Sequence, residues 1–93
     1  MIVTQDGSSV KILDDNGNYL RNCSGSGELK GFTQQYIVLN EGGSIKVYDP
    51  NGNYQRNINS NGAVISVSDA GVLVDESGSK KLYDFNGNYI RNV

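Results

Sequence analysis

The chain has 93 residues, a length that allows one domain with a small core. Its ten acidic and eight basic residues give a net charge of −2, and the basic residues form no run, which argues against nucleic acid or an anionic membrane as partners. The chain has no histidine and only one cysteine, which excludes an internal disulfide and a zinc site built from these ligands.

The missing histidine also limits catalysis, because no Ser–His or Cys–His nucleophile can be assembled. Cys23 is expected to be a buried, inert thiol, since a reactive thiol needs a neighbouring cation or imidazole. The chain does not start with a basic segment followed by an apolar one, and no apolar run approaches the ~18 residues of a membrane span. We therefore expect a cytoplasmic protein that is not an enzyme and that uses no cofactor or metal.

Short segments rich in Val, Ile and Tyr alternate with Gly, Asn, Asp and Ser along the whole chain, which is typical of strands joined by turns. No apolar pattern of helical period is long enough to predict a helix. The predicted strands, in chain order, cover residues 2–5, 9–14, 18–22, 28–33, 36–40, 44–49, 53–57, 63–68, 71–75, 79–84 and 88–92.

One phrase is written three times with a spacing of 35 residues, as "DDNGNYLRN" at 14–22, "DPNGNYQRN" at 49–57 and "DFNGNYIRN" at 84–92. A fixed period of ~20–50 residues is the signature of a repeat array. We predict an all-β fold made of tandem 35-residue repeats of short antiparallel strands. The single repeat domain, 1–93, divides into a partial repeat of three strands at 1–23 and two full repeats at 24–58 and 59–93.

Pro50 indicates the geometry of the repeated turn. A two-residue loop at Asn-Gly would leave Pro50 inside the paired ladder, where its missing N–H is costly. We therefore predict that Asp49-Pro50-Asn51-Gly52 is a type I turn with Gly52 in the left-handed conformation of a bulge. The cross-strand neighbours that follow from this register are Leu13/Tyr19, Tyr48/Tyr54 and Tyr83/Tyr89.

The segment "SIKVYDPNGNYQRNI" resembles the third and fourth strands of a blade in NHL-type and lactonase-like β-propellers, and "GAVISVSDAGVLVDESGSKKLYDFNGNYIRNV" is similar to one whole blade of that kind. The resemblance implies propeller-like blades, the first of which lacks a strand. Three blades cannot close a ring, so the resemblance also implies that copies of the chain associate, most simply as a dimer with six blades. The alternative is a pseudo-threefold β-prism or trefoil-like monomer.

A recurring set of Lys, Tyr and Arg residues is the candidate binding site. Strand alternation places the members of one hairpin on a single face. The two complete sets are Lys46, Tyr48, Tyr54 and Arg56, and Lys81, Tyr83, Tyr89 and Arg91, and an incomplete set consists of Lys11, Leu13, Tyr19 and Arg21. These side chains either pack against the neighbouring repeat, with cation–π contacts, or form a repeated pocket for a carbohydrate, a peptide or another small anionic ligand.

The carboxylate pairs Asp14/Asp15 and Asp75/Glu76 lie beside predicted turns, where solvated charge is their ordinary role. The repeated turn lacks calcium-loop spacing, since the twelfth residue counted from Asp14 is Gly25 rather than Glu. Our hypothesis is a non-catalytic β-repeat scaffold, a binding or protein-interaction module that self-associates into a closed ring. The alternative is a structural fragment, or an engineered or shortened propeller piece, with no ligand-binding activity of its own.

Overall fold

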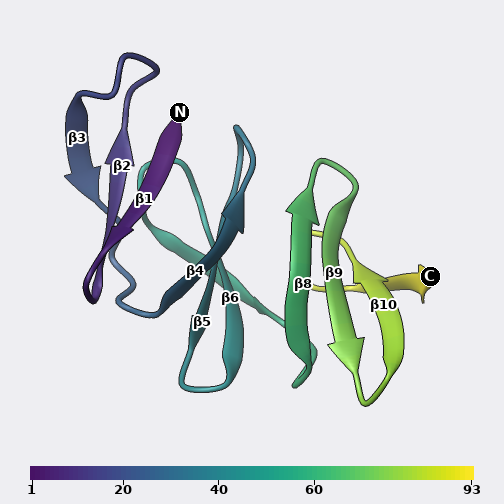
Figure 1. The fold of residues 1–93 in the computed structure, drawn as a ribbon. Coiled ribbons are helices and arrows are strands. Elements are labelled where there is room, and N and C mark those ends of the chain that lie inside the picture. The colour runs from purple at the N-terminus through teal and green to yellow at the C-terminus, as the bar shows by residue number, and fades with distance from the viewer.

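The computed structural model describes residues 1–93, and the chain is all-β, with eleven strands in three antiparallel sheets (Figure 1). The first sheet consists of β1 (Ile2–Asp6), β2 (Ser9–Leu13) and β3 (Tyr19–Asn22). The second sheet consists of β4 (Glu28–Phe32), β5 (Ile37–Glu41), β6 (Ser44–Tyr48) and β7 (Tyr54–Ile58). The third sheet consists of β8 (Ala63–Ser68), β9 (Gly71–Glu76), β10 (Ser79–Tyr83) and β11 (Tyr89–Asn92). The predicted fold class is confirmed, and every strand begins and ends within one residue of its expected bounds.

The repeated turn has the predicted geometry. Gly52 has a φ of +86°, and its N–H donates to the carbonyl oxygen of Asp49 at 2.9 Å. The Asp49 side chain accepts hydrogen bonds from the backbone N–H groups of Asn51 and Asn53, each at 2.9 Å. The same bonds occur in the other two copies, and in each copy the strand that follows the turn carries an extra residue as a bulge. Asp, Asn and Gly recur because this backbone path needs a cap and a left-handed residue.

The predicted cross-strand pairs are also confirmed. Tyr48 lies opposite Tyr54, and the two rings meet edge to face with their centroids 5.8 Å apart. The next copy repeats this arrangement at Tyr83 and Tyr89, with 5.9 Å between the centroids. Leu13 lies opposite Tyr19 in the first sheet. An aromatic pair in this geometry adds stability beyond the area that it buries.

The three sheets stand in a row, with the first strand in the sheet at one end and the end of the chain in the sheet at the other (Figure 1). The core is divided into two clusters. One joins Val3, Val10 and Ile12 to Ile37 and Leu39, between the first and second sheets. The other lies between the second and third sheets and includes Val38, Ile45, Val47, Val72 and Val74. A threefold prism would instead have one cluster shared by all three sheets, so the alternative architecture does not match the structure.

Strands β4 and β8 lie side by side at the inner edges of their sheets (Figure 1). Gly31 permits this approach, because a Cβ atom there would lie only 2.7 Å from the Cβ of Val67. Both strands carry a bulge at this level, between Leu29 and Gly31 in β4 and between Val64 and Ser66 in β8. No helical segment with the length and apolar character needed to cross a membrane is present.

Candidate functional site

The lysines and tyrosines of each predicted set lie on one face of their hairpin, as expected. In the second sheet Tyr48 pairs with Tyr54, and Lys46 pairs with Asn57 beside them. The Nζ atom of Lys46 lies 5.8 Å from the centroid of the Tyr54 ring, a cation–π contact. Only one ring of each pair is in the core, because Tyr48 is 3% exposed whereas Tyr54 is 50% exposed. Lys81, Tyr83 and Tyr89 repeat this arrangement in the third sheet.

The arginines do not share that face, and our prediction that they would was wrong. Arg56 pairs with Val47, and Arg91 pairs with Leu82, so each arginine points to the opposite side of its sheet from the tyrosines. Simple alternation fails because the bulge after the turn adds one residue between Tyr54 and Arg56. A single extra residue moves every later side chain to the other face.

Arg56 instead joins the second sheet to the third. Its guanidinium Nη1 donates to the carbonyl oxygen of Phe85 at 3.0 Å and to Oδ1 of Asn86 at 2.9 Å. Both acceptors belong to the repeated turn of the third sheet. Beside this contact the Phe85 ring stacks on Tyr36 of the second sheet, with 4.3 Å between the centroids. Arg91, the equivalent arginine of the third sheet, is exposed on a face that no further sheet covers.

The turn glycines also form these junctions. Gly52 lies so close to the end of the first sheet that a Cβ atom would be 2.9 Å from the Cα of Cys23, and its carbonyl accepts from Ser24 N–H at 2.8 Å. Gly87 lies equally close to the end of the second sheet, since a Cβ atom there would be 2.7 Å from the carbonyl oxygen of Asn57. At Gly17, in the first sheet, a Cβ atom would meet nothing within 4 Å. The turn of the first sheet is therefore open, because no sheet of residues 1–93 packs against it.

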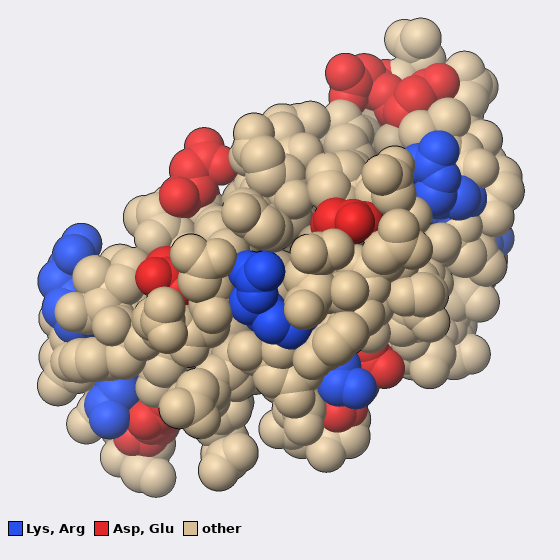
Figure 2. Space-filling view, turned by 180° about the vertical axis from the view of Figure 1, so that it is seen from behind, with Lys and Arg blue, Asp and Glu red and all other residues tan.

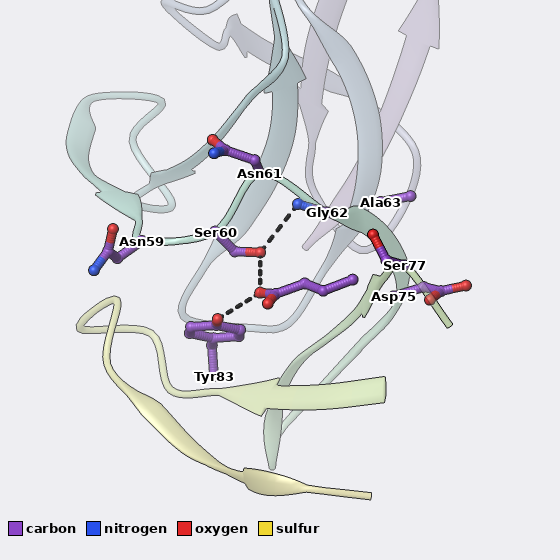
Figure 3. Close-up of a pocket in the computed structure, with 9 residues that line it drawn as sticks. Asn59, Ser60, Asn61, Gly62, Ala63, Asp75, Ser77 and Tyr83 are labelled. Carbon is purple, nitrogen blue, oxygen red and sulfur yellow. Dashed lines mark hydrogen bonds between the residues drawn. The ribbon is translucent and has the colours of Figure 1, made fainter. Parts of the chain in front are cut away.

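A second cluster of polar side chains surrounds Glu76, at the end of β9, and includes Ser60 and Tyr83, which Figure 3 labels. The hydroxyl groups of Ser60 and Tyr83 both donate to Oε2 of Glu76, the latter at 2.5 Å, and the Nζ atom of Lys81 lies 3.1 Å from Oε1. The hydrogen bonds from Ser60, Tyr83 and Lys81 lower the pKa of Glu76 to about 2. The same carboxylate raises the pKa of Tyr83 and of Lys81, so both stay protonated as donors.

A surface pocket of about 500 Å³ adjoins this cluster. Its walls are the segment that links β7 to β8 and the end of the β9–β10 hairpin, and most of the lining is polar (Figure 3). The lining side chains include Asn59, Ser60, Asn61, Asp75 and Ser77. Two carboxylates at one end disfavour a small anion, and Glu76 already has three partners. The cluster joins the segment that links β7 to β8 to the third sheet, through the bond from Ser60 to Glu76.

The Glu76 cluster has weaker counterparts in the other copies. Glu41 accepts a hydrogen bond from Tyr48, whose pKa is raised by burial and then by this carboxylate. In the first copy, Asp6 and Lys11 form an ion pair of 3.0 Å. An acidic residue therefore recurs five positions before the repeated lysine. That spacing is present in the sequence and could have predicted a contact between Glu76 and Lys81. From the alternation of strands and turns alone, we expect Glu76 only as a solvated charge beside a turn.

The remaining candidate chemistry is sparse. Cys23 is buried, as expected, and burial raises the pKa of its thiol, which therefore stays protonated. No three His, Cys, Asp or Glu side chains are grouped closely enough to hold a metal ion. Lys and Arg are interspersed with Asp and Glu on the face seen in Figure 2, with no large field of one sign.

Comparisons with protein-family models, curated proteins and solved structures found no match for this chain. The resemblance to NHL-type and lactonase-like blades therefore stays a prediction. The best-defined recurring site within the chain is the junction between successive sheets. It combines the end of an outer strand with the turn of the following sheet, and at the junction of the second and third sheets Arg56 also bonds to that turn.

Proposed function

We propose that this protein is a non-catalytic β-repeat scaffold, an interaction module that associates with copies of itself through the two end faces of its row of sheets. One observation carries the proposal. The contact of a turn glycine with the end of the preceding sheet occurs twice within the chain, at Gly52 and Gly87, and the second of these junctions also holds the Arg56 bonds. One unmatched half of the junction lies open at each end of the row.

The third sheet carries the half that holds an arginine. Arg91 occupies the place that Arg56 has in the second sheet. Leu73 and Leu82 occupy the places of Val38 and Val47, whose side chains are covered by the third sheet. No sheet of the chain covers this side of the third sheet. Leu82 is already buried, at 8% exposed, and Leu73 is half-buried, so exposed Arg91 rather than an apolar patch marks this face.

The first sheet carries the complementary half. Its turn, from Asp14 to Asn18, has the same hydrogen bonds as the turn that receives Arg56. Asn16 supplies the amide that Asn86 supplies in the third sheet, and Asp15 stands at the position of Phe85. Tyr19 lies on the same open face and is 57% exposed. By analogy with Arg56, Arg91 of one copy would meet the Asp15 carbonyl and the Asn16 side chain of the next. The Asp15 carboxylate, which pairs with the Met1 ammonium, would add a negative charge beside this contact.

This contact joins two different surfaces, so it adds copies head to tail. Such a contact either closes into a ring or continues as a fibre. Two copies would supply six sheets and use both junctions, which makes a closed dimer the simplest solution. The scaffold would then present the same surfaces twice around the ring.

Size-exclusion chromatography with light scattering tests the assembly. We expect a sharp species of twice the chain mass of 10.1 kDa. Arg91→Glu and, separately, Asp15→Arg should each shift the protein toward the monomer, because each places like charges across the junction. Lys30→Glu, which makes the same charge change as Arg91→Glu in the second sheet, is the matched control and should leave the mass unchanged.

Mixing the Arg91→Glu and Asp15→Arg variants gives the sharpest outcome. In a mixed dimer the two introduced side chains, which have opposite charges, would face each other at one junction. At the other junction, the unchanged Arg91 of one chain would face the unchanged Asp15 of its partner. Both junctions are complementary only in the mixed dimer, so mixing should restore the doubled mass. A wild-type chain that stays monomeric at all concentrations, or variants that do not recover on mixing, would contradict the head-to-tail proposal.

A further inference from the structure

The first sheet has three strands where the other two have four. Beside β5 lies β4, and beside β9 lies β8, but the equivalent place beside β1 is empty of any strand of the chain. Strand β1 pairs only with β2, so its other edge carries backbone groups without a strand partner. The edge has no proline, no lysine and no bulge, which are the usual means of preventing strand addition.

The register shows which backbone groups point outward. The carbonyl oxygen of Val10 accepts from Cys23 N–H at 2.8 Å, on the β3 side, so the pair of Gln5 and Val10 exchanges no backbone bonds. Bonded and non-bonded pairs alternate along an antiparallel ladder. The N–H and C=O groups of Val3 and Gln5 therefore face the open edge. The matching residues of the second sheet, Val38 and Asn40, lie opposite Gly31 and Glu28 of β4.

We propose that the open edge of β1 is a binding site for an extended peptide segment, which joins the first sheet as an antiparallel fourth strand. This is a site separate from the end-face junction, and it does not depend on self-association. In β-strand addition, backbone hydrogen bonds supply the affinity and alternate side chains supply the selectivity.

Strands β4 and β8, which occupy the equivalent edge position in the second and third sheets, indicate which residues the ligand should have. Both have a small residue flanked by apolar ones, since Gly31 lies between Leu29 and Phe32, and Ser66 lies between Val64 and Val67. The flanking residues pack against the core clusters. The ligand is therefore an extended segment with a small residue between apolar ones, whose apolar side chains would cover Ile2 and Thr4.

Space for such a strand follows from the spacing of the sheets. Strand β4 fits beside β8 because Gly31 faces Val67. A small residue at the same place in the ligand would allow the same approach to β4. The side chain of Gln5 already reaches β4, where it accepts from Leu29 N–H at 2.9 Å and donates to the Gly27 carbonyl at 2.9 Å. These bonds hold the β1 edge and the β4 edge in fixed relation.

The test uses the full chain and a labelled synthetic peptide with the sequence of residues 61–70, "NGAVISVSDA". Fluorescence anisotropy should show saturable binding, and NMR shifts should be confined to β1 and its neighbours. Gln5→Pro removes one outward N–H donor and keeps the bonds to β2, whereas Gln5→Ala removes the same side chain and keeps the donor. We expect Gln5→Pro to bind the peptide at least about fivefold more weakly than Gln5→Ala, as the loss of one hydrogen bond implies.

A second control is a peptide in which the residue equivalent to Ser66 is proline, which should not bind. Absence of binding by the wild-type chain, or equal affinity of the two Gln5 variants, would overturn the proposal. A doubled mass that Gln5→Pro abolishes and Gln5→Ala does not would make a second copy, paired edge to edge, the occupant, and would also overturn it. The Arg91→Glu variant should still bind the peptide, which separates this site from the end-face junction.

Discussion

Several polar side chains of this chain form hydrogen bonds that hold one sheet to the next. Glu76 is the clearest case. Its carboxylate accepts a hydrogen bond from Ser60, in the segment that links β7 to β8, and it also bonds to Tyr83 and Lys81 of its own sheet. These partners favour the charged form, and the pKa of Glu76 is accordingly lowered to about 2 from an ordinary value of 4.5. A carboxylate held in this way links the stability of the fold to pH.

Glu76 should therefore contribute to the loss of folding stability at acid pH. Because its pKa is lower in the folded than in the unfolded chain, its contribution is complete above about pH 4.5 and is lost as the pH falls toward 2. Glu76→Gln should reduce the free energy of unfolding at pH 7 and make it less dependent on pH between these limits. Urea unfolding at a series of pH values measures this.

The control for the pH series is Glu28→Gln, which removes an exposed carboxylate on β4. The two variants differ in whether the lost carboxylate binds the connecting segment. If Glu76→Gln kept the full pH dependence of the wild-type chain, the network around Glu76 would not stabilise the fold as the structure indicates.

Among the strands, the bulges and the inner edges decide how the sheets fit together. The bulge after each turn directs Arg56 toward the following sheet and away from Tyr54. The bulges in β4 and β8 lie where those strands approach each other, and Gly31 supplies the space for Val67. A glycine inside a strand, away from any turn, is typical of a place where two backbones approach closely.

Gly31→Ala should destabilise the chain by about 1–3 kcal/mol, the usual cost of overpacking, because the new Cβ would lie 2.7 Å from the Cβ of Val67. In a Val67→Gly background the same change should be neutral or stabilising, since alanine is the better strand residue. Denaturant unfolding of the two single variants and the double variant measures the coupling. Additive effects would show that the two strands do not depend on this contact.

The three sheets together form a row in which only the second is covered on both faces. Ile37 and Leu39 face the first sheet, while Val38 and Val47 face the third, and all four are fully buried. Every residue of β3, by contrast, is exposed. The row measures 38 × 24 × 19 Å, so each end sheet leaves a broad face uncovered.

Amide hydrogen exchange should follow this gradient in the monomeric Arg91→Glu chain. Amides of β5 and β6 should exchange most slowly, with opening free energies near that of global unfolding, and those of β3 and β11 most rapidly. Mass spectrometry of peptides from each sheet, measured over time, tests the order. Equal protection of all three sheets would mean that burial of the second sheet on both faces is not what stabilises the row.

The amino-acid sequence determined the features that depend on neighbouring residues. Strand bounds, the turn that begins at Asp49 and the pairing of Tyr48 with Tyr54 all follow from local backbone preferences, written once in each copy. The buried state of Cys23 was also expected from the sequence, because the chain has no histidine to activate a thiol. The turn and strand features could be predicted because the physical forces that decide them act within a few residues.

Only the tertiary structure decided which surfaces meet. The bulge sends Arg56 to the turn of the third sheet, and the connecting segment brings Ser60 to Glu76 across 16 positions of the sequence. Neither contact is visible in a pattern of alternating residues, because each depends on how one sheet stacks on the next. The stacking also leaves the edge of β1 and the Gly17 turn open, and only the arrangement of the three sheets shows that these surfaces have no partner within the chain.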